Sequence, residues 1–400
     1  MQAQTDLQAQ SDTVFAPVTT LEVIASLRAS LSQVMRIENH TIHEMPVEVI
    51  EFTGALTCPS DEAFEHIYAR FTALGYTPTL TERNGKQIVI AQHGIVEPTA
   101  NNTRLNVVLL LLTIVSTWFV GIQYAAGEQL SQLLPRDADF LDLLRVSFTT
   151  PGLWLAGLPY VLTLLGILGV HEMGHYVAGR LHKASVTLPF FIPMPIGLGT
   201  MGAVIRLKSP IKNRRQLFDI GVAGPLAGLA IAVPLLIVGL MTSPVEFIGR
   251  PVPGAQEGNS ILYALLKFAV KGQWLPGNGY DVIVNAIAFP AWFGLLVTMI
   301  NLLPIGQLDG GHVTYALFGR RQWNIATLAV FGLVGLGLYL MVAANQLFNV
   351  WLLWAFMAQV FGLRHPPPLD DITPLDRKRR LIGYAVIVIF ILIFTPIPFS

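Results

Sequence analysis

The sequence predicts an α-helical multi-span membrane protein preceded by a small soluble α+β domain. Of its 400 residues, 53% are hydrophobic and only 12% are charged, whereas roughly 25% of the residues in an ordinary soluble domain are charged. From Leu105 onward, apolar stretches of about 20 residues recur, which is the length needed to cross roughly 30 Å of hydrocarbon. Before Leu105, the apolar residues keep the shorter periodicity of a globular fold.

Residues 1–103 form the predicted soluble domain, in which we expect two helices and three strands. One helix is expected at 20–37, and a second begins near Pro59 and ends at Gly75. The dipeptide Asn84-Gly85 is a strong signal for a two-residue hairpin turn. The expected strands are 47–56, 79–83 and 86–91. No cluster of catalytic residue types occurs in this part of the sequence.

Residues 104–400 form the predicted transmembrane domain, with about seven spanning helices. A short loop resembling a β-hairpin follows the second span. The expected spans are 105–126, 153–179, 217–241, 282–303, 323–344, 348–363 and 381–398.

Basic residues predict the orientation of these spans, because Lys and Arg accumulate in short cytosolic loops. The loop at 181–216 contains six basic residues and no acidic residue, whereas the loop at 127–150 contains more acidic than basic residues. We therefore expect the first of these loops to be cytosolic. Alternation through an odd number of spans then places the N-terminal domain in the cytosol and the C-terminus outside.

The charge of the chain limits the kinds of partner it can bind, and its cysteine content limits the covalent links it can form. The formal net charge is +0 and no long charged run occurs, so we expect no nucleic-acid partner. The lipid bilayer is an expected partner, and the sequence predicts no oligomeric state. Cys58 is the single cysteine, which excludes an internal disulfide, and we interpret it as a small buried residue.

The strongest chemical signal is the string His171-Glu172-Met173-Gly174-His175 within the second span. Residues four apart share a helix face, so His171 and His175 can reach one Zn²⁺ ion while Glu172 lies beside them as a base. Ionisable side chains deep in a span cost roughly 2.5–3.5 kcal/mol each on insertion scales. Three of them within five residues therefore indicate a metal, water or a partner.

A catalytic zinc site usually has three protein ligands, and this string supplies two of them. We predict that Asp309 is the third, because it lies in the segment NLLPIGQLDGGH at 301–312, at the cytosolic end of the fourth span. Pro304, Gly306 and Gly310 would interrupt the helix there. Irregular backbone at membrane depth is tolerated where protein covers it or where it lines a wet cavity.

HEMGH in one span and NLLPIGQLDGG at the end of a later one resemble the site-2 protease family of intramembrane zinc metalloproteases. The similarity covers the core at about 153–319. Within that family, the sequence looks most like the cyanobacterial and chloroplast-type branch, which has stretches similar to LGTMGA at 198–203 and DIGVAGPLAG at 219–228. Nothing matches the cysteine-containing or PDZ-bearing insertions of other branches.

The resemblance implies that one zinc ion binds to His171, His175 and Asp309 and that Glu172 is the base. It also implies that Asn301 holds the substrate or polarises its carbonyl group. From the residues alone, Asn301 could instead be a helix-capping residue. We interpret His312 as a cavity-lining or solvated histidine outside the core site.

Two further patterns flank this string. Residues 187–192 and 202–207 are strand-like, and an exposed edge there could pair with an extended substrate. A purely structural hairpin explains the same pattern. Gly221, Gly224 and Gly228 have the small-residue spacing of closely packed helices, and we interpret them as structural support. Asp219 is favourably placed at the start of the third span and is not expected to be catalytic.

These observations predict a metalloendopeptidase that cleaves a membrane-anchored protein substrate in or near its transmembrane segment, in regulated intramembrane proteolysis. A bacterial cell membrane, or a photosynthetic membrane, is the expected location. A metal or solute transporter is the alternative from another class. Transport needs no base beside the metal, and inverted repeats are not evident. A catalytically inactive membrane scaffold is the second alternative, although all the expected site residues are present.

Overall fold

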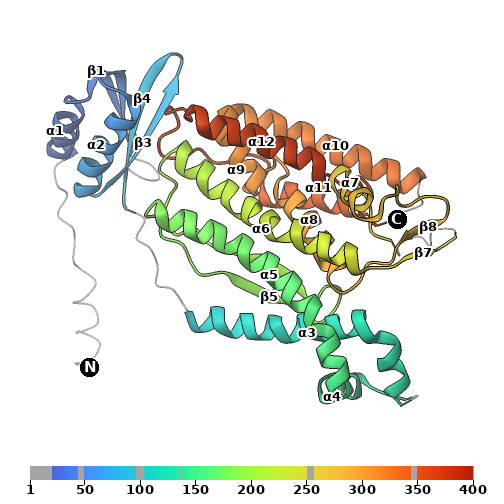
Figure 1. Ribbon diagram of the computed structural model, residues 1–400. Helices are drawn as coiled ribbons and strands as arrows, with labels where there is room; N and C mark the ends of the chain where they lie inside the picture. The colour runs from blue at the N-terminus through green and yellow to red at the C-terminus, as the bar shows by residue number, and fades with distance from the viewer. Residues whose placement is uncertain are drawn as a thin grey trace, which may run out of the picture. The chain divides into compact units, whose positions relative to one another are not determined.

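The computed structural model describes residues 20–43, 49–95, 103–135, 137–249, 256–343 and 349–399 (Figure 1). The described chain divides into two compact units. Pro368–Thr373 belongs to the first unit together with the N-terminal residues, and the rest of the chain forms the second unit. Five residues of the strands, loops and spans predicted above lie outside the described ranges: Val47, Glu48, Arg136, Ala344 and Phe348.

The first unit contains a four-stranded antiparallel sheet and two helices. Its strands lie in the order β1-β2-β4-β3. Leu27, Phe64 and Phe71 of the helices pack with Phe52 and Val89 of the sheet in one buried core, which is the burial that stabilises such a small domain. The elements are α1 (Thr20–Leu31), β1 (Met35–His43), β2 (Val49–Leu56), α2 (Ser60–Ala73), β3 (Tyr76–Arg83) and β4 (Lys86–His93).

The predicted hairpin is confirmed and one predicted helix is too long. Asn84 and Gly85 connect β3 to β4 with φ of 55° and 75°, the left-handed pair that a two-residue turn requires. The helix predicted at 20–37 is wrong beyond Leu31, because Met35–His43 pairs with β2 as a fourth strand. That pairing buries Met35 and satisfies the backbone, so tertiary contacts override the local helical pattern.

The edge strand β3 is extended by Pro368–Thr373, which comes from far along the chain. The N–H of Leu80 donates to the carbonyl of Leu369 at 2.6 Å, and the N–H of Asp371 donates to the carbonyl of Leu80 at 2.9 Å. Asp370 is buried beside them. Part of the open edge is thereby paired. The sequence-based boundary assigned this segment to the transmembrane domain.

The second unit is built mainly from helices, with α5 and α6 lying side by side in its interior (Figure 1). Its two small antiparallel sheets are β5–β6 and β7–β8. Its helices are α3 (Thr103–Leu133), α4 (Phe140–Thr149), α5 (Pro151–Leu181), α6 (Arg214–Thr242), α7 (Ile261–Lys271), α8 (Ala288–Asn301), α9 (Asp309–Phe318), the 3₁₀ turn η1 (Gly319–Arg321), α10 (Gln322–Ala343), α11 (Val350–Phe361) and α12 (Arg377–Ile393). Its strands are β5 (Phe190–Pro193), β6 (Thr200–Val204), β7 (Val245–Phe247) and β8 (Tyr280–Val282).

Among the described residues, four helical segments are long and apolar enough to cross a membrane: Thr103–Leu133, Pro151–Leu181, Arg214–Thr242 and Asp309–Ala343. They contain four of the predicted spans. The other three predicted spans correspond to α8, α11 and α12, with 14, 12 and 17 residues, and full crossing needs about 20. The predicted total of about seven spans is therefore not confirmed.

The outer faces of these helices are apolar. On α10, Leu328 and Phe331 are 73% and 70% exposed, and Leu111 of α3 is 57% exposed. A soluble protein rarely presents contiguous apolar patches of this kind to water. In hydrocarbon, exposed apolar side chains carry no unfavourable solvation free energy. The exposed faces therefore agree with the membrane protein that the composition predicts.

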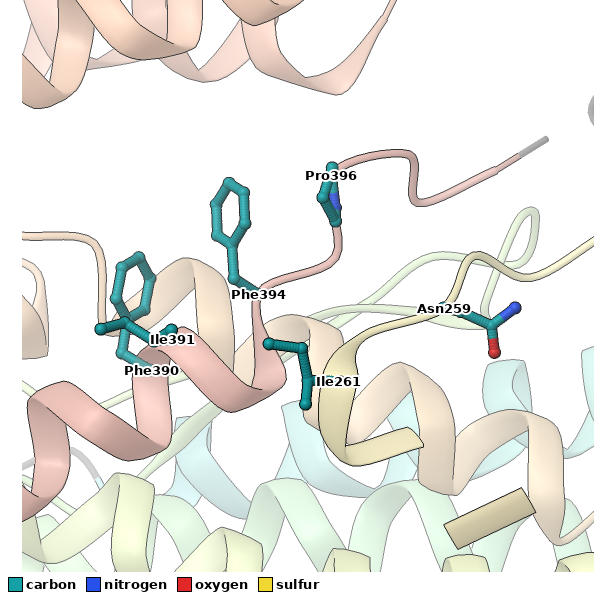
Figure 2. Close-up of a pocket in the computed structure, with 6 residues that line it drawn as sticks. All are labelled: Asn259, Ile261, Phe390, Ile391, Phe394 and Pro396. Carbon is teal, nitrogen blue, oxygen red and sulfur yellow. The ribbon is translucent and has the colours of Figure 1, made fainter. Parts of the chain in front are cut away.

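A pocket of about 470 Å³ lies at the C-terminal end of α12 (Figure 2). Most of its lining is aromatic or aliphatic, and none of its residues is a predicted site residue. The lining residues are Asn259, Ile261, Phe390, Ile391, Phe394 and Pro396.

Candidate metal centre

α5 places His171, Glu172 and His175 in the interior of the second unit. All three are more than nine-tenths buried. The two histidines are one helical turn apart, so their side chains lie on one face. The helix is continuous from Pro151 to Leu181, and it holds this face against α6 and α8.

Asp309 reaches the same place because a tight turn ends α8 and begins α9. Gly306 has φ of +51°, a left-handed conformation that suits glycine. A Cβ on Gly310 would lie 1.9 Å from the carbonyl oxygen of Leu302, and one on Gly311 would lie 2.2 Å from that of Gly306. The glycines around Asp309 therefore allow the chain to fold back on itself and place Asp309 in the first turn of α9.

The three predicted ligands meet in the structure. The Nε2 atoms of His171 and His175 are 3.1 Å apart. Asp309 places Oδ2 3.3 Å from Nε2 of His171 and Oδ1 3.3 Å from Nε2 of His175. Ligand atoms at tetrahedral angles around a zinc ion, with bonds of about 2.0–2.1 Å, would lie ~3.3–3.4 Å apart. The donor set and its spacing therefore fit zinc.

The surroundings of the histidines direct their Nε2 atoms inward. The Nδ1 atom of His175 lies 2.7 Å from the carbonyl oxygen of Ile220, so Nδ1–H donates there and Nε2 is left with its lone pair. Asn301, at the end of α8, has Nδ2 3.5 Å from Nε2 of His171. The structure thus brings Asn301 to the site as the sequence predicted, and its role stays a prediction.

Glu172 is placed beside the ligand group and outside it. The three residues whose donor atoms converge are His171, His175 and Asp309, and Glu172 follows the first of them on the next position of α5. Its carboxylate accepts a hydrogen bond from the backbone N–H of Ile205, just after β6. Glu172 is therefore a buried carboxylate directly beside the converging ligand atoms and not one of them.

Glycines on one face of α6 make room for the histidines. A Cβ on Gly224 would lie 2.1 Å from Nε2 of His175, and one on Gly228 would lie 3.2 Å from Nδ1 of His171. A Cβ on Gly221 would lie 2.7 Å from Cβ of His312. The predicted structural role of these glycines is therefore specific, since each faces one imidazole.

Asp219 is not among the three converging ligands and instead binds two other side chains. It accepts from Nε2 of His182 at 2.8 Å and from Nη2 of Arg379 at 2.6 Å. These contacts connect the ends of α5 and α12 to the second turn of α6. That Asp219 is not catalytic stays a prediction, and its partners His182 and Arg379 could not be found from a local sequence pattern.

His365 is the neighbour that sequence reasoning missed. Its Nε2 lies 2.6 Å from Nδ1 of His312, which the sequence analysis left outside the core site. The only sequence signal is a histidine before a run of prolines, His365-Pro366-Pro367. His312 and His365 are 53 positions apart, so no helix or strand periodicity in the sequence can indicate that they meet.

Residues 159–342 match peptidase family M50. The chain carries an M50 peptidase domain. The M50 match contains all five predicted site residues: His171, Glu172, His175, Asn301 and Asp309.

Several curated plant proteins are similar to the chain. It is 31% identical over 292 residues to a protein of Oryza sativa subsp. indica named probable zinc metalloprotease EGY2, chloroplastic. The aligned region covers 72% of this chain and 51% of that protein. It is 30% identical over 290 residues to the EGY2 protein of Arabidopsis thaliana, covering 72% and 50%. It is 33% identical over 240 residues to the Arabidopsis EGY1 protein, covering 58% and 42%.

The chain spans about half the length of these relatives. Their names and the M50 match confirm the predicted resemblance to the chloroplast-type branch of the site-2 protease family. They also agree with zinc as the metal of the family. No solved structure matches the chain.

Gly224→Ala is expected to reduce bound zinc to well below one equivalent per chain, because the new methyl group occupies the place of the His175 imidazole. Zinc would be measured by atomic absorption on purified protein. Gly166→Ala on α5 is the matched control, because a Cβ there meets no atom within 4 Å, and helical alanine is if anything about 0.5–1 kcal/mol better than glycine. Equal zinc content in the two variants would contradict this account of the glycine.

Proposed function

We propose that the chain is a zinc metalloendopeptidase that hydrolyses a peptide bond in or near a transmembrane segment of a membrane-anchored protein. The observation that carries the proposal is the convergence of His171, His175 and Asp309 inside an apolar helical unit, with Glu172 buried beside them. The M50 match and the relatives named as probable zinc metalloproteases support the same activity.

Each residue of the site has a distinct part in this proposal. His171, His175 and Asp309 would hold the ion, and a zinc ion bound there would supply Lewis acidity to a carbonyl group and to water. Glu172 accepts a proton from water and later delivers a proton to the leaving amine. Asn301 has an amide N–H group near His171 that can donate to the oxygen of the scissile carbonyl as negative charge develops there.

The hairpin after α5 supports capture of the substrate as an extended strand. The N–H of Thr187 donates to the carbonyl of Arg206, and the N–H of Lys208 donates to that of Ser185. Because alternate residues of a strand direct their backbone groups to opposite sides, Ala203 and Ile205 present theirs on the other side. That side is where the N–H of Ile205 meets Glu172. A substrate strand added there would pass next to the site.

The membrane setting supports the substrate class. A helical peptide keeps its carbonyl groups in hydrogen bonds, so a spanning segment must be extended before cleavage. We propose a protein substrate anchored in the same bilayer, a regulator released by cleavage near its cytosolic edge. The location is a bacterial cell membrane or a photosynthetic membrane, and the names of the plant relatives, which read chloroplastic, support the second. The span total of about seven and the cytosolic N-terminal domain remain part of this proposal.

A transporter that coordinates a metal cargo would use the same three ligands. A buried glutamate outside the ligand group, bonded to the backbone of Ile205 on the side of the hairpin that faces away from β5, serves hydrolysis and is not needed for transport. The two functions differ in what they require of Glu172.

Glu172→Gln is expected to retain close to one zinc per chain and to lose proteolysis of a membrane-embedded peptide substrate by about 10²- to 10⁴-fold, the usual worth of a general base. Asp309→Ala is expected to lose both zinc and proteolysis, because two protein ligands remain. Zinc content and product formation would be measured on the same detergent-purified samples. Near wild-type cleavage by Glu172→Gln, or metal transport without any cleavage by wild type, would exclude the proposed function.

Ala203→Pro is expected to raise KM for the membrane substrate while zinc content stays unchanged, because proline removes a backbone donor from the free edge of β6. Ala203→Ser is the matched control, since it alters the side chain and keeps the donor. Steady-state cleavage of a fluorogenic membrane peptide provides the measurement. Identical KM values for the two variants would leave the hairpin as a structural element only.

The orientation is tested by cysteine labelling in intact cells, in a background in which Cys58 is replaced by serine. Glu65→Cys in the first unit and Lys183→Cys after α5 are expected to be protected from a membrane-impermeant reagent, because the basic loop at 181–216 is cytosolic. Gln273→Cys, after α7, is expected to be labelled. The reverse pattern would invert the proposed topology.

A further inference from the structure

A second pair of histidines lies next to the candidate metal centre. His312 is in the first turn of α9, one turn after Asp309, and His365 is in the segment between α11 and α12. Their nearest ring nitrogens are 2.6 Å apart, and the ring planes are inclined by 82°. At this distance one imidazole donates a hydrogen bond and the other accepts it.

His365 is held rigidly from several sides. It is 3% exposed. Its backbone N–H donates to Oε1 of Gln322 at 3.1 Å, and its backbone carbonyl accepts from Nε1 of Trp323 at 3.1 Å. The ring of Tyr315 packs against it at 4.9 Å. The backbone of His365 is thus fixed by two hydrogen bonds and its ring is packed on Tyr315, so the imidazole presents its Nε2 to His312 from an anchored position.

The same segment also holds the turn that precedes Asp309. The buried Gln322 that binds the His365 backbone donates through Nε2 to the carbonyl of Pro304 at 3.1 Å. The N–H of Gly306 donates to the carbonyl of Leu363 at 3.0 Å. Backbone groups before Asp309 and the imidazole after it are therefore both tied to residues 363–365.

His312 occupies a defined place relative to the ligands. On α6, Gly221, Gly224 and Gly228 follow one another at helical spacing and face His312, His175 and His171 in that order. His312 therefore lies about one helical turn along α6 from His175. Gly221 is also near the backbone of Asp309, since its Cβ would lie 3.5 Å from the Asp309 carbonyl oxygen.

We propose that His365 and His312 are positioning residues for the metal centre: their hydrogen bond fixes the first turn of α9 and thereby the direction of the Asp309 carboxylate. The inference rests on the proposed zinc site. Neither residue is a ligand or touches the substrate. Partners that orient a ligand typically change metal affinity or activity by about 10- to 100-fold when they are removed.

Burial keeps the His365 imidazole neutral, as the hydrogen bond between the two rings requires. Burial lowers the pKa of the His365 imidazole to about 3, with the neighbouring His312 as a smaller cause. His365 is therefore neutral near pH 7, and a neutral ring can share one hydrogen with His312 without repulsion. Asn or Gln can supply a comparable donor and acceptor, whereas a hydrocarbon ring cannot.

The test compares zinc affinity among His365 variants of the full chain, by competition with a chromophoric chelator. His365→Phe keeps a ring against Tyr315 and is expected to weaken zinc binding by about 10- to 100-fold. His365→Gln, which restores a hydrogen-bonding group, is expected to stay within ~3-fold of wild type. At saturating zinc, both variants should recover activity with KM unchanged. Should His365→Phe fail to accumulate, His365→Met also lacks the nitrogen and carries the same expectation.

Two further variants separate positioning from general stability. His182→Leu removes a histidine that pairs with Asp219 and not with the turn at Asp309, and its zinc affinity should equal that of wild type. The double variant His312→Phe/His365→Phe should bind zinc no more weakly than either single variant, because the pair acts as one unit. Wild-type affinity in His365→Phe, or additive losses in the double variant, would overturn the inference. Absence of zinc from wild-type protein would instead refute the proposed function itself.

Discussion

The site in the second unit depends on compensating the charge of one largely enclosed carboxylate, that of Asp309, whose side chain is 13% exposed. Asp309 lies among apolar helices, where an isolated negative charge costs several kcal/mol or more unless it is paired or binds a metal. Its two oxygens each lie 3.3 Å from an imidazole nitrogen. A cation shared by all three side chains is the arrangement that satisfies the carboxylate and both lone pairs. The other features near the site bring these groups to within bonding distance of one point.

That requirement explains why the backbone is so closely packed there. Imidazoles fit between α5 and α6 only where the facing residue has no side chain, and a Cβ on Gly174 would itself lie 2.6 Å from the carbonyl oxygen of Ala223. Helices approaching this closely gain van der Waals contact and exclude lipid. The turn before Asp309 is held by Gln322 and by residues 363–365 instead of by regular secondary structure. For Asp309, hydrogen bonds from the Gln322 side chain and the Leu363 backbone take the place of the regular helix that holds the two histidines.

Local patterns predicted the parts of this arrangement that depend on helical spacing. His171 and His175 share a face because they are four apart, and Gly306 and Gly310 mark the break that exposes Asp309. Long-range pairs were not accessible in this way. His312 and His365 meet only because the chain folds back between α11 and α12, and β1 forms because β2 is available to pair with it. The helices α8 and α11 are apolar, but with 14 and 12 residues they are shorter than a full crossing needs, and sequence hydropathy alone does not reveal where such a helix ends.

The segment 362–373 shows why the boundary between the two units could not be read from composition. Residues 363–365 hold the turn at Asp309, and after Pro366 and Pro367 the chain enters the first unit, where Leu369 and Asp371 pair with Leu80 of the edge strand. Part of the sheet edge of the first unit is therefore paired by residues that follow most helices of the second unit in the sequence. Because Leu369 and Asp371 are synthesised long after β3, this stretch of the edge cannot pair with them until the chain has been made as far as Asp371. No local pattern near β3 could have revealed that dependence.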